Sequence, residues 1–194
     1  IAEAEMPWWR EIFYFIEPEI LLPSILLLSL NISLPALTNF IILYAKELGI
    51  ANFAPYFVCI GATSMFARPL LGRLSDKIGR APSVAAGFAC QIIALLLITV
   101  MANLLGVIFC GAIYMLGNAI GSSTTLALAV ERADPQRRGK QMATFSIAYP
   151  LSYGVGSLIT GGAIDIAGYV GMFLILAAVQ AAGLIFAVRR RSEL

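Results

Sequence analysis

The chain has 194 residues, of which 60% are hydrophobic and only 12% are charged, and its formal net charge is +2. A soluble domain needs more charge to cover its surface, so this composition excludes an ordinary soluble protein and favours the bilayer as the solvent. The small net charge gives no reason to expect a nucleic-acid partner, and the absence of histidine disfavours metal-based or histidine-based catalysis. Cys59, Cys90 and Cys110 lie inside apolar runs, so we interpret them as packing residues and expect no cofactor.

The first 20 residues differ in kind from the rest of the chain. Aromatic residues such as Trp8, Trp9 and Phe13 alternate there with charged ones such as Arg10 and Glu11. Amphipathic rings prefer the headgroup level of a membrane, with the charges in water. We therefore predict that residues 1–20 form a cytoplasmic or interfacial linker; a disordered tail is the alternative.

Six long apolar segments follow the linker. A hydrocarbon core about 30 Å thick takes about 20 helical residues to cross, and each segment is close to that length. The segments are residues 23–44, 53–71, 81–101, 104–130, 142–164 and 169–188. They predict an all-α integral membrane protein in which residues 21–188 form a bundle of six transmembrane helices and residues 189–194 form a basic cytoplasmic tail.

The basic residues predict the orientation of the bundle. Twelve of the thirteen flank the same ends of the segments, and only Lys46 lies on the other side. The twelve are Arg10, Arg68, Arg73, Lys77, Arg80, Arg132, Arg137, Arg138, Lys140, Arg189, Arg190 and Arg191. Basic loops stay in the cytoplasm, so we expect both termini there, in a plasma membrane such as the bacterial inner membrane.

The second connection carries the most specific motif. Residues 72–80 read Gly-Arg-Leu-Ser-Asp-Lys-Ile-Gly-Arg. Gly72 and Gly79 are expected to permit a tight reversal between two helices. Asp76 can cap a helix N-terminus, where free N–H groups favour negative charge, and it lies among Arg73, Lys77 and Arg80.

This motif resembles the signature loop of the major facilitator superfamily, although Ala81 replaces the further basic residue usual after Arg80. The segment 131–139, Glu-Arg-Ala-Asp-Pro-Gln-Arg-Arg-Gly, is also similar to the family's pattern after the fourth helix. The resemblance makes Glu131 the expected charge partner of Arg80 or Arg138. It also implies that Asp76 latches one conformation.

The resemblance implies half of a twelve-helix transporter fold, made of two inverted three-helix repeats. The segment 15–23, Arg68-Pro69 and the basic tail look like the carboxy-terminal half of a drug or metabolite exporter. The implied function is secondary active transport of a small molecule by alternating access, with efflux or antiport expected. The implied partners are the lipid bilayer and either an amino-terminal six-helix half or a second copy.

Polar residues within the spans should face a cavity or another helix, because they are costly in lipid. Several recur at helical spacing in the first, second, fourth and fifth spans, which the resemblance arranges around a central cavity. The expected substrate-facing residues are Asn31, Thr38, Asn39, Tyr56, Tyr114, Asn118, Tyr149 and Tyr153. The alternative is that such residues only hydrogen-bond neighbouring helices. The small residues Gly117 and Gly121, and likewise Gly154 and Gly161, are expected to allow close helix packing.

No Asp or Glu lies in the middle of a predicted span, so a coupling acid for a proton-driven carrier is expected outside this chain. Two other functions stay open: a non-transporting membrane subunit that serves assembly, and a half-size carrier that acts as a homodimer. A membrane enzyme is disfavoured by the lack of histidine, of a serine nucleophile motif and of mid-span acids.

Overall fold

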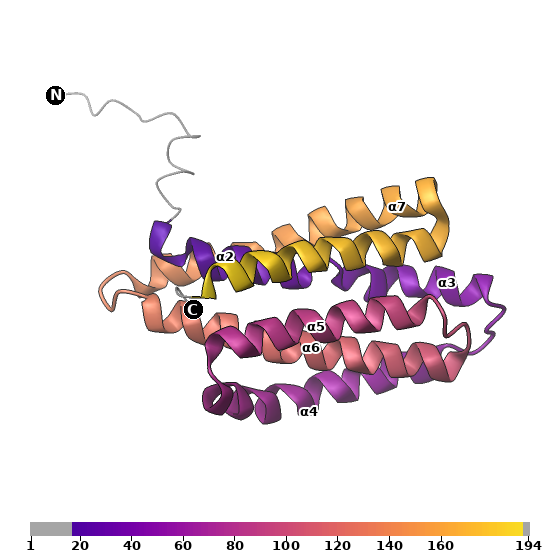
Figure 1. The fold of residues 1–194 in the computed structure, drawn as a ribbon, viewed down its shortest axis with the longest axis horizontal. Helices are drawn as coiled ribbons and strands as arrows, with labels where there is room; N and C mark the ends of the chain where they lie inside the picture. Colours follow the sequence, from indigo (N-terminus) through magenta and orange to yellow (C-terminus); the bar gives the residue numbers. More distant parts are fainter. Residues whose placement is uncertain (1–16, 192–194) are drawn as a thin grey trace.

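The computed structural model describes residues 17–191, apart from the side chains of residues 73, 74 and 76. All of its regular elements are helices, in agreement with the all-α prediction (Figure 1). In chain order they are α2 (Pro18–Asn31), the π-helix η1 (Ala36–Phe40), α3 (Ile41–Glu47), α4 (Ala54–Ile78), α5 (Arg80–Ile98), α6 (Leu104–Arg132) and α7 (Arg138–Arg189). The predicted linker lies outside the described residues up to residue 16, and so does the tail from residue 192.

The first predicted span is broken in its middle. Residues 32 and 33 form a turn after α2, and Pro35, just before η1, has no N–H to donate to the carbonyl of Asn31. Buried side chains from other helices form hydrogen bonds with residues around this break. Gln91 Nε2 donates to the carbonyl of Leu30 at 3.1 Å, and Gln180 donates to the hydroxyl of Ser33. The break is therefore held by α5 and α7, not left to solvent.

The predicted signature loop is mostly helix. Helix α4 continues to Ile78, and Gly79, with φ +99° and ψ 161°, is the single residue between α4 and α5. The prediction that Gly72 shapes the reversal is wrong, because Gly72 lies inside α4. A residue with a Cβ rarely adopts the φ of Gly79, so this glycine alone makes the turn.

Helix α7 consists of two antiparallel arms, residues 138–167 and 169–189, that meet at Gly168 (Figure 1). These arms contain the fifth and sixth predicted segments. Four helical stretches among residues 17–191 are long and apolar enough to cross a membrane: Pro18–Glu47, Arg80–Ile98, Leu104–Arg132 and Arg138–Arg189. Helix α4 is not among them, and Arg68, near its middle, lowers its hydropathy.

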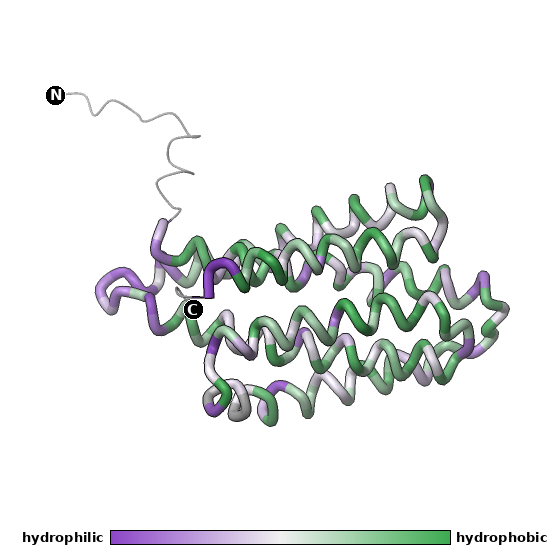
Figure 2. Tube along the Cα trace, viewed as in Figure 1, coloured by the Kyte–Doolittle hydropathy of each residue, from purple (hydrophilic) through white to green (hydrophobic). Residues whose placement is uncertain are grey.

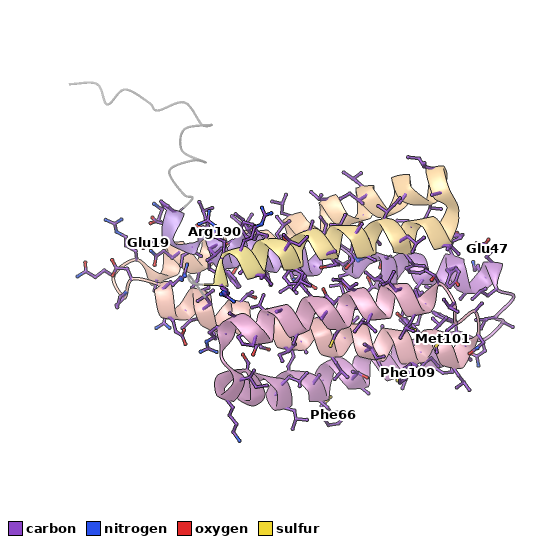
Figure 3. All side chains as sticks on the ribbon, viewed as in Figure 1. Glu19, Glu47, Phe66, Met101, Phe109 and Arg190 are labelled. Atoms are coloured by element: carbon purple, nitrogen blue, oxygen red, sulfur yellow. The ribbon has the colours of Figure 1, made fainter. Side chains whose placement is uncertain are left out.

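The exterior of the bundle suits a bilayer. Figure 2 shows hydrophobic residues along the lengths of the helices and hydrophilic ones mainly at the two ends. Figure 3 places Glu19 and Arg190 at one end and Glu47 at the other, whereas Phe66 and Phe109 project from the side. The side chains of Phe66 and Phe109 are 69% and 55% exposed. Large apolar side chains exposed on this scale need a non-aqueous surrounding or a partner.

Packing is closest where glycines remove side chains. Helix α5 packs extensively on α6, and a Cβ on Gly117 would lie 2.7 Å from the carbonyl oxygen of Gly87. Helix α2 packs on α7, where a Cβ on Gly156 would lie 2.0 Å from the carbonyl oxygen of Ile32. By contrast, contact between α4 and α7 is minor, and this leaves a groove between them.

Candidate functional site

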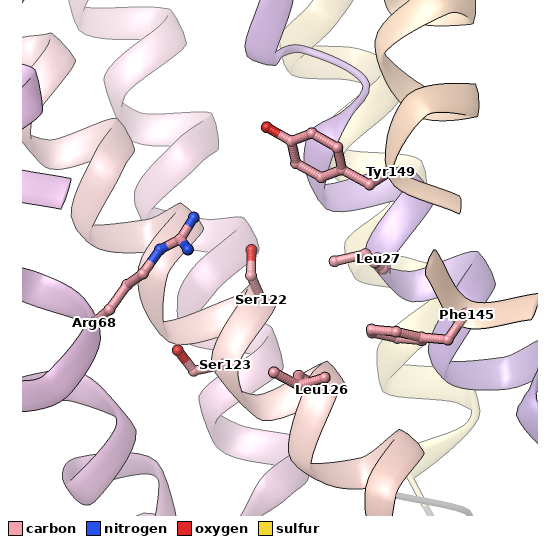
Figure 4. Close-up of a pocket in the computed structure, with 7 residues that line it drawn as sticks. All are labelled: Leu27, Arg68, Ser122, Ser123, Leu126, Phe145 and Tyr149. Atoms are coloured by element: carbon pink, nitrogen blue, oxygen red, sulfur yellow. The ribbon is translucent and has the colours of Figure 1, made fainter. Parts of the chain in front are cut away.

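The groove between α4 and the first arm of α7 contains two adjoining hollows, of about 390 Å³ and 300 Å³. The larger one is lined by Leu27, Arg68, Ser122, Ser123, Leu126, Phe145 and Tyr149 (Figure 4). The smaller one is lined by Leu34, Thr38, Phe57, Ile60, Gly61, Ser64, Arg68, Met115, Asn118 and Tyr149. Residues of α2, α4, α6 and α7 thus surround a common space.

Arg68 and Tyr149 line both hollows, so they lie at the boundary between them. Arg68 is near the middle of α4, and Tyr149 is near the middle of the first arm of α7. Figure 4 shows the guanidinium of Arg68 and the hydroxyl of Tyr149 directed into the space between the two helices. The site is therefore about halfway along the bundle.

Arg68 makes no hydrogen bond or ion pair with any residue that the structure describes. Among the residues that the structure describes, none that lines the two hollows is acidic. On insertion scales a charged side chain at the centre of a membrane-spanning helix costs about 2.5–3.5 kcal/mol. Such a residue normally faces the bundle interior or a cavity; Arg68, which is exposed, lines the groove.

Buried amides connect the wall of the groove to the break after α2. Asn118 Nδ2 donates to Asn31 Oδ1 at 3.0 Å, and Asn31 Nδ2 donates to the carbonyl of Leu27 at 2.8 Å. The hydroxyl of Ser122 in turn donates to Asn118 Oδ1 at 3.4 Å. Of these, Asn118 and Ser122 reach a hollow, whereas Asn31 is buried behind them.

A second connection joins η1 to α7. The hydroxyls of Thr38 and Tyr153 are 2.9 Å apart, and Thr38 also donates to the carbonyl of Leu34 at 3.0 Å. Thr38 lines the smaller hollow. The predicted residues Thr38, Asn118 and Tyr149 therefore come together around the groove, with Tyr153 bonded to one of them.

The other predicted cavity residues lie elsewhere. Tyr56 and Tyr114 are fully buried in the core: Tyr56 donates to the carbonyl of Leu37 at 2.8 Å, and Tyr114 bonds Ser33 at 2.7 Å. Tyr56 fits there because Gly111 on α6 has no side chain; a Cβ on it would lie 2.6 Å from the Tyr56 ring. Asn39 is exposed and lines neither hollow.

The expected packing role of Gly154 and Gly161 is wrong within this chain. A Cβ on either would meet no atom within 4 Å, whereas Gly156 packs against Ile32 at the end of α2, and Thr160, one turn further on, is buried. The two faces are adjacent on one helix, so the sequence pattern did not distinguish them. Gly117 packs closely on α5 as expected, and Gly121 packs against Leu30.

At the end of the bundle that holds the second connection, Arg80 at the start of α5 forms an ion pair with Glu131 at the end of α6. Of the two expected partners of Glu131, the structure has Arg80; Arg138 is exposed. The buried hydroxyls of Ser75 and Thr124 are 2.6 Å apart and tie α4 to α6 nearby. Lys77 is exposed, and the side chains of Arg73 and Asp76 lie outside the described residues.

The connection between α6 and α7 is held to the start of α2. Gln141 accepts from the backbone N–H of Asp134 at 2.7 Å and donates to Glu19 at 2.8 Å. Lys140 Nζ lies 2.8 Å from Glu17 Oε1. The hydrogen bond from Lys140 holds the pKa of the Glu17 carboxyl below its ordinary value. Sequence reasoning missed both contacts, because they join residues about 120 positions apart.

Arg68 was also missed as a site residue, since it was counted among the basic residues of the second connection. Its position in the sequence carried a usable signal. It lies well inside a helix that begins at Ala54, and it is followed by Pro69. Among the described residues, no group of three His, Cys, Asp or Glu side chains is placed to hold a metal ion.

Comparison with known proteins gives one family. The model of the Major Facilitator Superfamily matches residues 12–193. No curated protein matches the sequence. The match covers all the described helices and both hollows of the groove.

Proposed function

The chain belongs to the major facilitator superfamily of small-molecule membrane transporters, and we propose that it is the carboxy-terminal six-helix half of a twelve-helix carrier. In this proposal α2, η1 and α3 together form the first crossing, and α4, α5 and α6 form the next three. The two arms of α7 form the last two. The six crossings would form two inverted three-helix repeats, each made of three consecutive crossings.

The observation that carries the proposal is the groove between α4 and α7. It is open along one side of the bundle, and it is lined by side chains of the first, second, fourth and fifth proposed crossings. Its only charged lining residue among those described lies about halfway along the bundle. Substrate sites of secondary transporters lie near the bilayer midplane between repeats, so a second six-helix bundle facing this groove would enclose such a site.

Contacts around the second connection, at the proposed cytoplasmic end of the bundle, support a role of this region in conformational change. Arg80 and Glu131 join α5 to α6, while Ser75 and Thr124 join α4 to α6. We propose that Gly72, Arg73, Asp76, Lys77, Gly79 and Arg80 hold one state of the carrier, with Asp76 set against a helix end of the partner bundle. Rocking of the two bundles would break that contact.

The proposed orientation follows from the basic residues. Both termini and the connections near Gly79 and Asp134 would be cytoplasmic, in a plasma membrane such as the bacterial inner membrane. Export of a drug-like or metabolite substrate, by antiport, is the proposed direction of transport. The coupling acid, if protons drive the cycle, would lie in the other half.

Counterflow in proteoliposomes tests the transport function. The complete carrier that contains this chain is purified, and accumulation of a radiolabelled small molecule is measured against a preloaded excess of the same compound. We expect saturable counterflow that protein-free liposomes lack. Absence of counterflow for every compound in a panel of anionic, neutral and cationic solutes would contradict the proposal.

The protein mass in the detergent complex tests the half-carrier arrangement. Light scattering should show this chain together with an amino-terminal six-helix half, either in one polypeptide or as a co-expressed partner. Two copies of this chain that support counterflow would favour the homodimeric carrier. A stable assembly with no counterflow would favour a non-transporting membrane subunit.

A further inference from the structure

The strongest unexplained feature of the groove is the isolated charge of Arg68. The described residues that line the two hollows include hydroxyls, one amide and many apolar side chains, but no carboxylate. Arg68 also makes no hydrogen bond with the described residues. The five N–H donors of its guanidinium therefore have no negatively charged partner among the described lining residues.

A cation in such a place favours a negative charge beside it. The groove is bordered by apolar side chains such as Leu126 and Phe145. They lower the local dielectric constant, so the guanidinium attracts a negative charge more strongly than it would in water. The planar fork of arginine matches a carboxylate or phosphate through two parallel hydrogen bonds. Hydroxyls of Ser123 and Tyr149 line the same hollow and can donate to the remaining oxygens.

The other lining residues indicate what kind of molecule can carry the anionic group. Leu27, Leu126 and Phe145 line one of the two hollows that Arg68 borders, and Phe57, Ile60 and Met115 line the other. Both hollows are of the size of a small organic molecule. The groove thus offers one anion-binding group between two apolar surfaces.

We infer that Arg68 binds the anionic head of the transported substrate, and that the substrate class is small organic anions with a carboxylate or phosphate on an apolar body. The inference rests on the proposed transport function and assigns a substrate class to its site. Tyr149 closes the site from the opposite wall, where its hydroxyl is a further donor to the anion. The same head chemistry occurs in soluble organic acids and in anionic lipids, and the test separates these sources.

A carboxylate of the facing six-helix bundle is the competing occupant. In that case Arg68 would form a structural ion pair between the halves, and the site would not discriminate ligands by charge. The loss of Arg68 would then weaken assembly, with no effect specific to anions. Ligand discrimination and assembly are therefore measured on the same variants.

The experiment uses four water-soluble probes with one ring and different heads: benzoate, phenyl phosphate, benzamide and benzylammonium. Binding to the complete carrier in detergent is measured by calorimetry and by the shift of Tm. We expect benzoate and phenyl phosphate to bind at least about tenfold more tightly than benzamide and benzylammonium, since a charge-assisted pair supplies that factor. Equal binding of benzoate and benzamide would overturn the inference.

Variants of Arg68 assign the effect to this side chain. R68Q should weaken benzoate binding about 10- to 100-fold and leave benzamide binding unchanged. R68K keeps the charge without the planar fork and should fall between wild type and R68Q. The matched control R189Q removes a positive charge from the exposed end of α7 and should bind benzoate like wild type. If R68Q binds benzoate as tightly as wild type does, the assignment to Arg68 is refuted. It is also refuted if R68Q fails to assemble and the wild-type protein binds benzoate and benzamide equally well.

Lipid composition separates the two sources of the anion. Wild type and R68Q are placed in nanodiscs of phosphatidylcholine with and without phosphatidylglycerol. If an anionic lipid is the natural ligand, phosphatidylglycerol should compete with benzoate in wild type. If a soluble anion is the ligand, benzoate affinity should be the same in both lipids. Either result supports anion binding at Arg68, provided that R68Q weakens that binding.

Counterflow distinguishes a failed inference from a failed function. If benzoate binding depends on Arg68 but no probe is transported, the anion site stands and the transport proposal fails. If benzamide shows counterflow that R68Q does not change, while benzoate binding never depends on Arg68, transport stands and the anion site fails.

Discussion

Arg68 on α4 and Tyr149 on α7 border the same two hollows from opposite walls, and each is followed directly by a proline in its helix. Pro69 and Pro150 cannot donate to the carbonyls four residues earlier, those of Met65 and Ser146. Helices bend most easily at such positions. The two residues that line both hollows therefore each lie beside the position where their own helix bends most easily.

Removal of the Tyr149 hydroxyl should weaken substrate binding moderately. Y149F loses one hydrogen bond to the bound molecule, and the loss should raise KM for counterflow about three- to tenfold. Y169F is the matched control, because Tyr169 packs near Tyr44, with ring centroids 5.8 Å apart, and lines neither hollow. An unchanged KM in Y149F would place the substrate away from this wall.

Gly156→Ala should destabilise the bundle, because the new Cβ would lie 2.0 Å from the carbonyl oxygen of Ile32. The backbones of α2 and α7 would have to separate, at a cost of about 1–3 kcal/mol. Gly154→Ala, two residues away, meets no atom within 4 Å and should leave stability nearly unchanged. Thermal unfolding of both variants in the same detergent measures the difference. Equal values of Tm would contradict the close approach of α2 and α7.

The Arg80–Glu131 ion pair should contribute little to stability and more to transport. The two side chains are 21% and 55% exposed, so their coupling in a double-mutant cycle should be about 0.2–1 kcal/mol. If the pair supports the proposed conformational latch, E131Q should lower the initial rate of counterflow while Tm changes little. The charge swap R80E/E131R should recover part of that rate. A swap as slow as the single variants would argue against pairing as the cause.

Cysteine labelling tests the orientation. Single cysteines at Lys77 and Arg137 should react with an impermeant maleimide only after the membrane is opened, and a cysteine at Lys46 should react in intact cells. The background first needs Cys59, Cys90 and Cys110 replaced, of which Cys110 is buried and the other two are partly exposed. Reaction of positions 77 and 137 from opposite faces would refute the proposed arrangement of crossings.

The Glu17–Lys140 pair predicts a pH dependence. The pKa of Glu17 is lowered, so the folded state binds that proton less readily than the unfolded chain. The stabilisation is fully present above the ordinary carboxyl pKa of about 4.3 and is lost as the pH falls through the lowered value. The Tm difference between wild type and E17Q should be constant from about pH 7 to 5 and should shrink below about pH 4.

Hydropathy was enough to locate the helices. Lipid excludes charges and unpaired backbone groups, so a segment that crosses it must be helical and apolar over about 20 residues, and such a run is visible in the sequence. Each predicted segment falls on a helical stretch, and the family assignment from residues 72–80 agrees with the match over residues 12–193. The turn was less predictable, since a glycine such as Gly72 is compatible with both a reversal and a helix. The structure distinguishes the two glycines, because Gly79 has a positive φ and Gly72 lies inside α4.

The site was predicted in part, and for a physical reason. Spacing identifies the residues that share a helical face, but it does not say which neighbour that face meets. Tyr114 and Asn118 are one turn apart on α6, yet Tyr114 points into the core and Asn118 reaches the groove. Arg68 lies inside the predicted segment 53–71 but counts by its charge among the basic residues near the second connection, whereas its depth along α4 makes it part of the site.

Gly168 is the only residue of α7 with non-helical backbone angles, φ +66° and ψ −173°. The two arms therefore meet without a stretch of chain that could take up slack. A displacement of one arm along its axis must pull or push the other at this corner. The arm that carries Tyr149 and the arm that carries Gln180 would thus move together. Movement of the groove wall at Tyr149 would in this way be coupled to Gln180, which holds the break after α2 through Ser33.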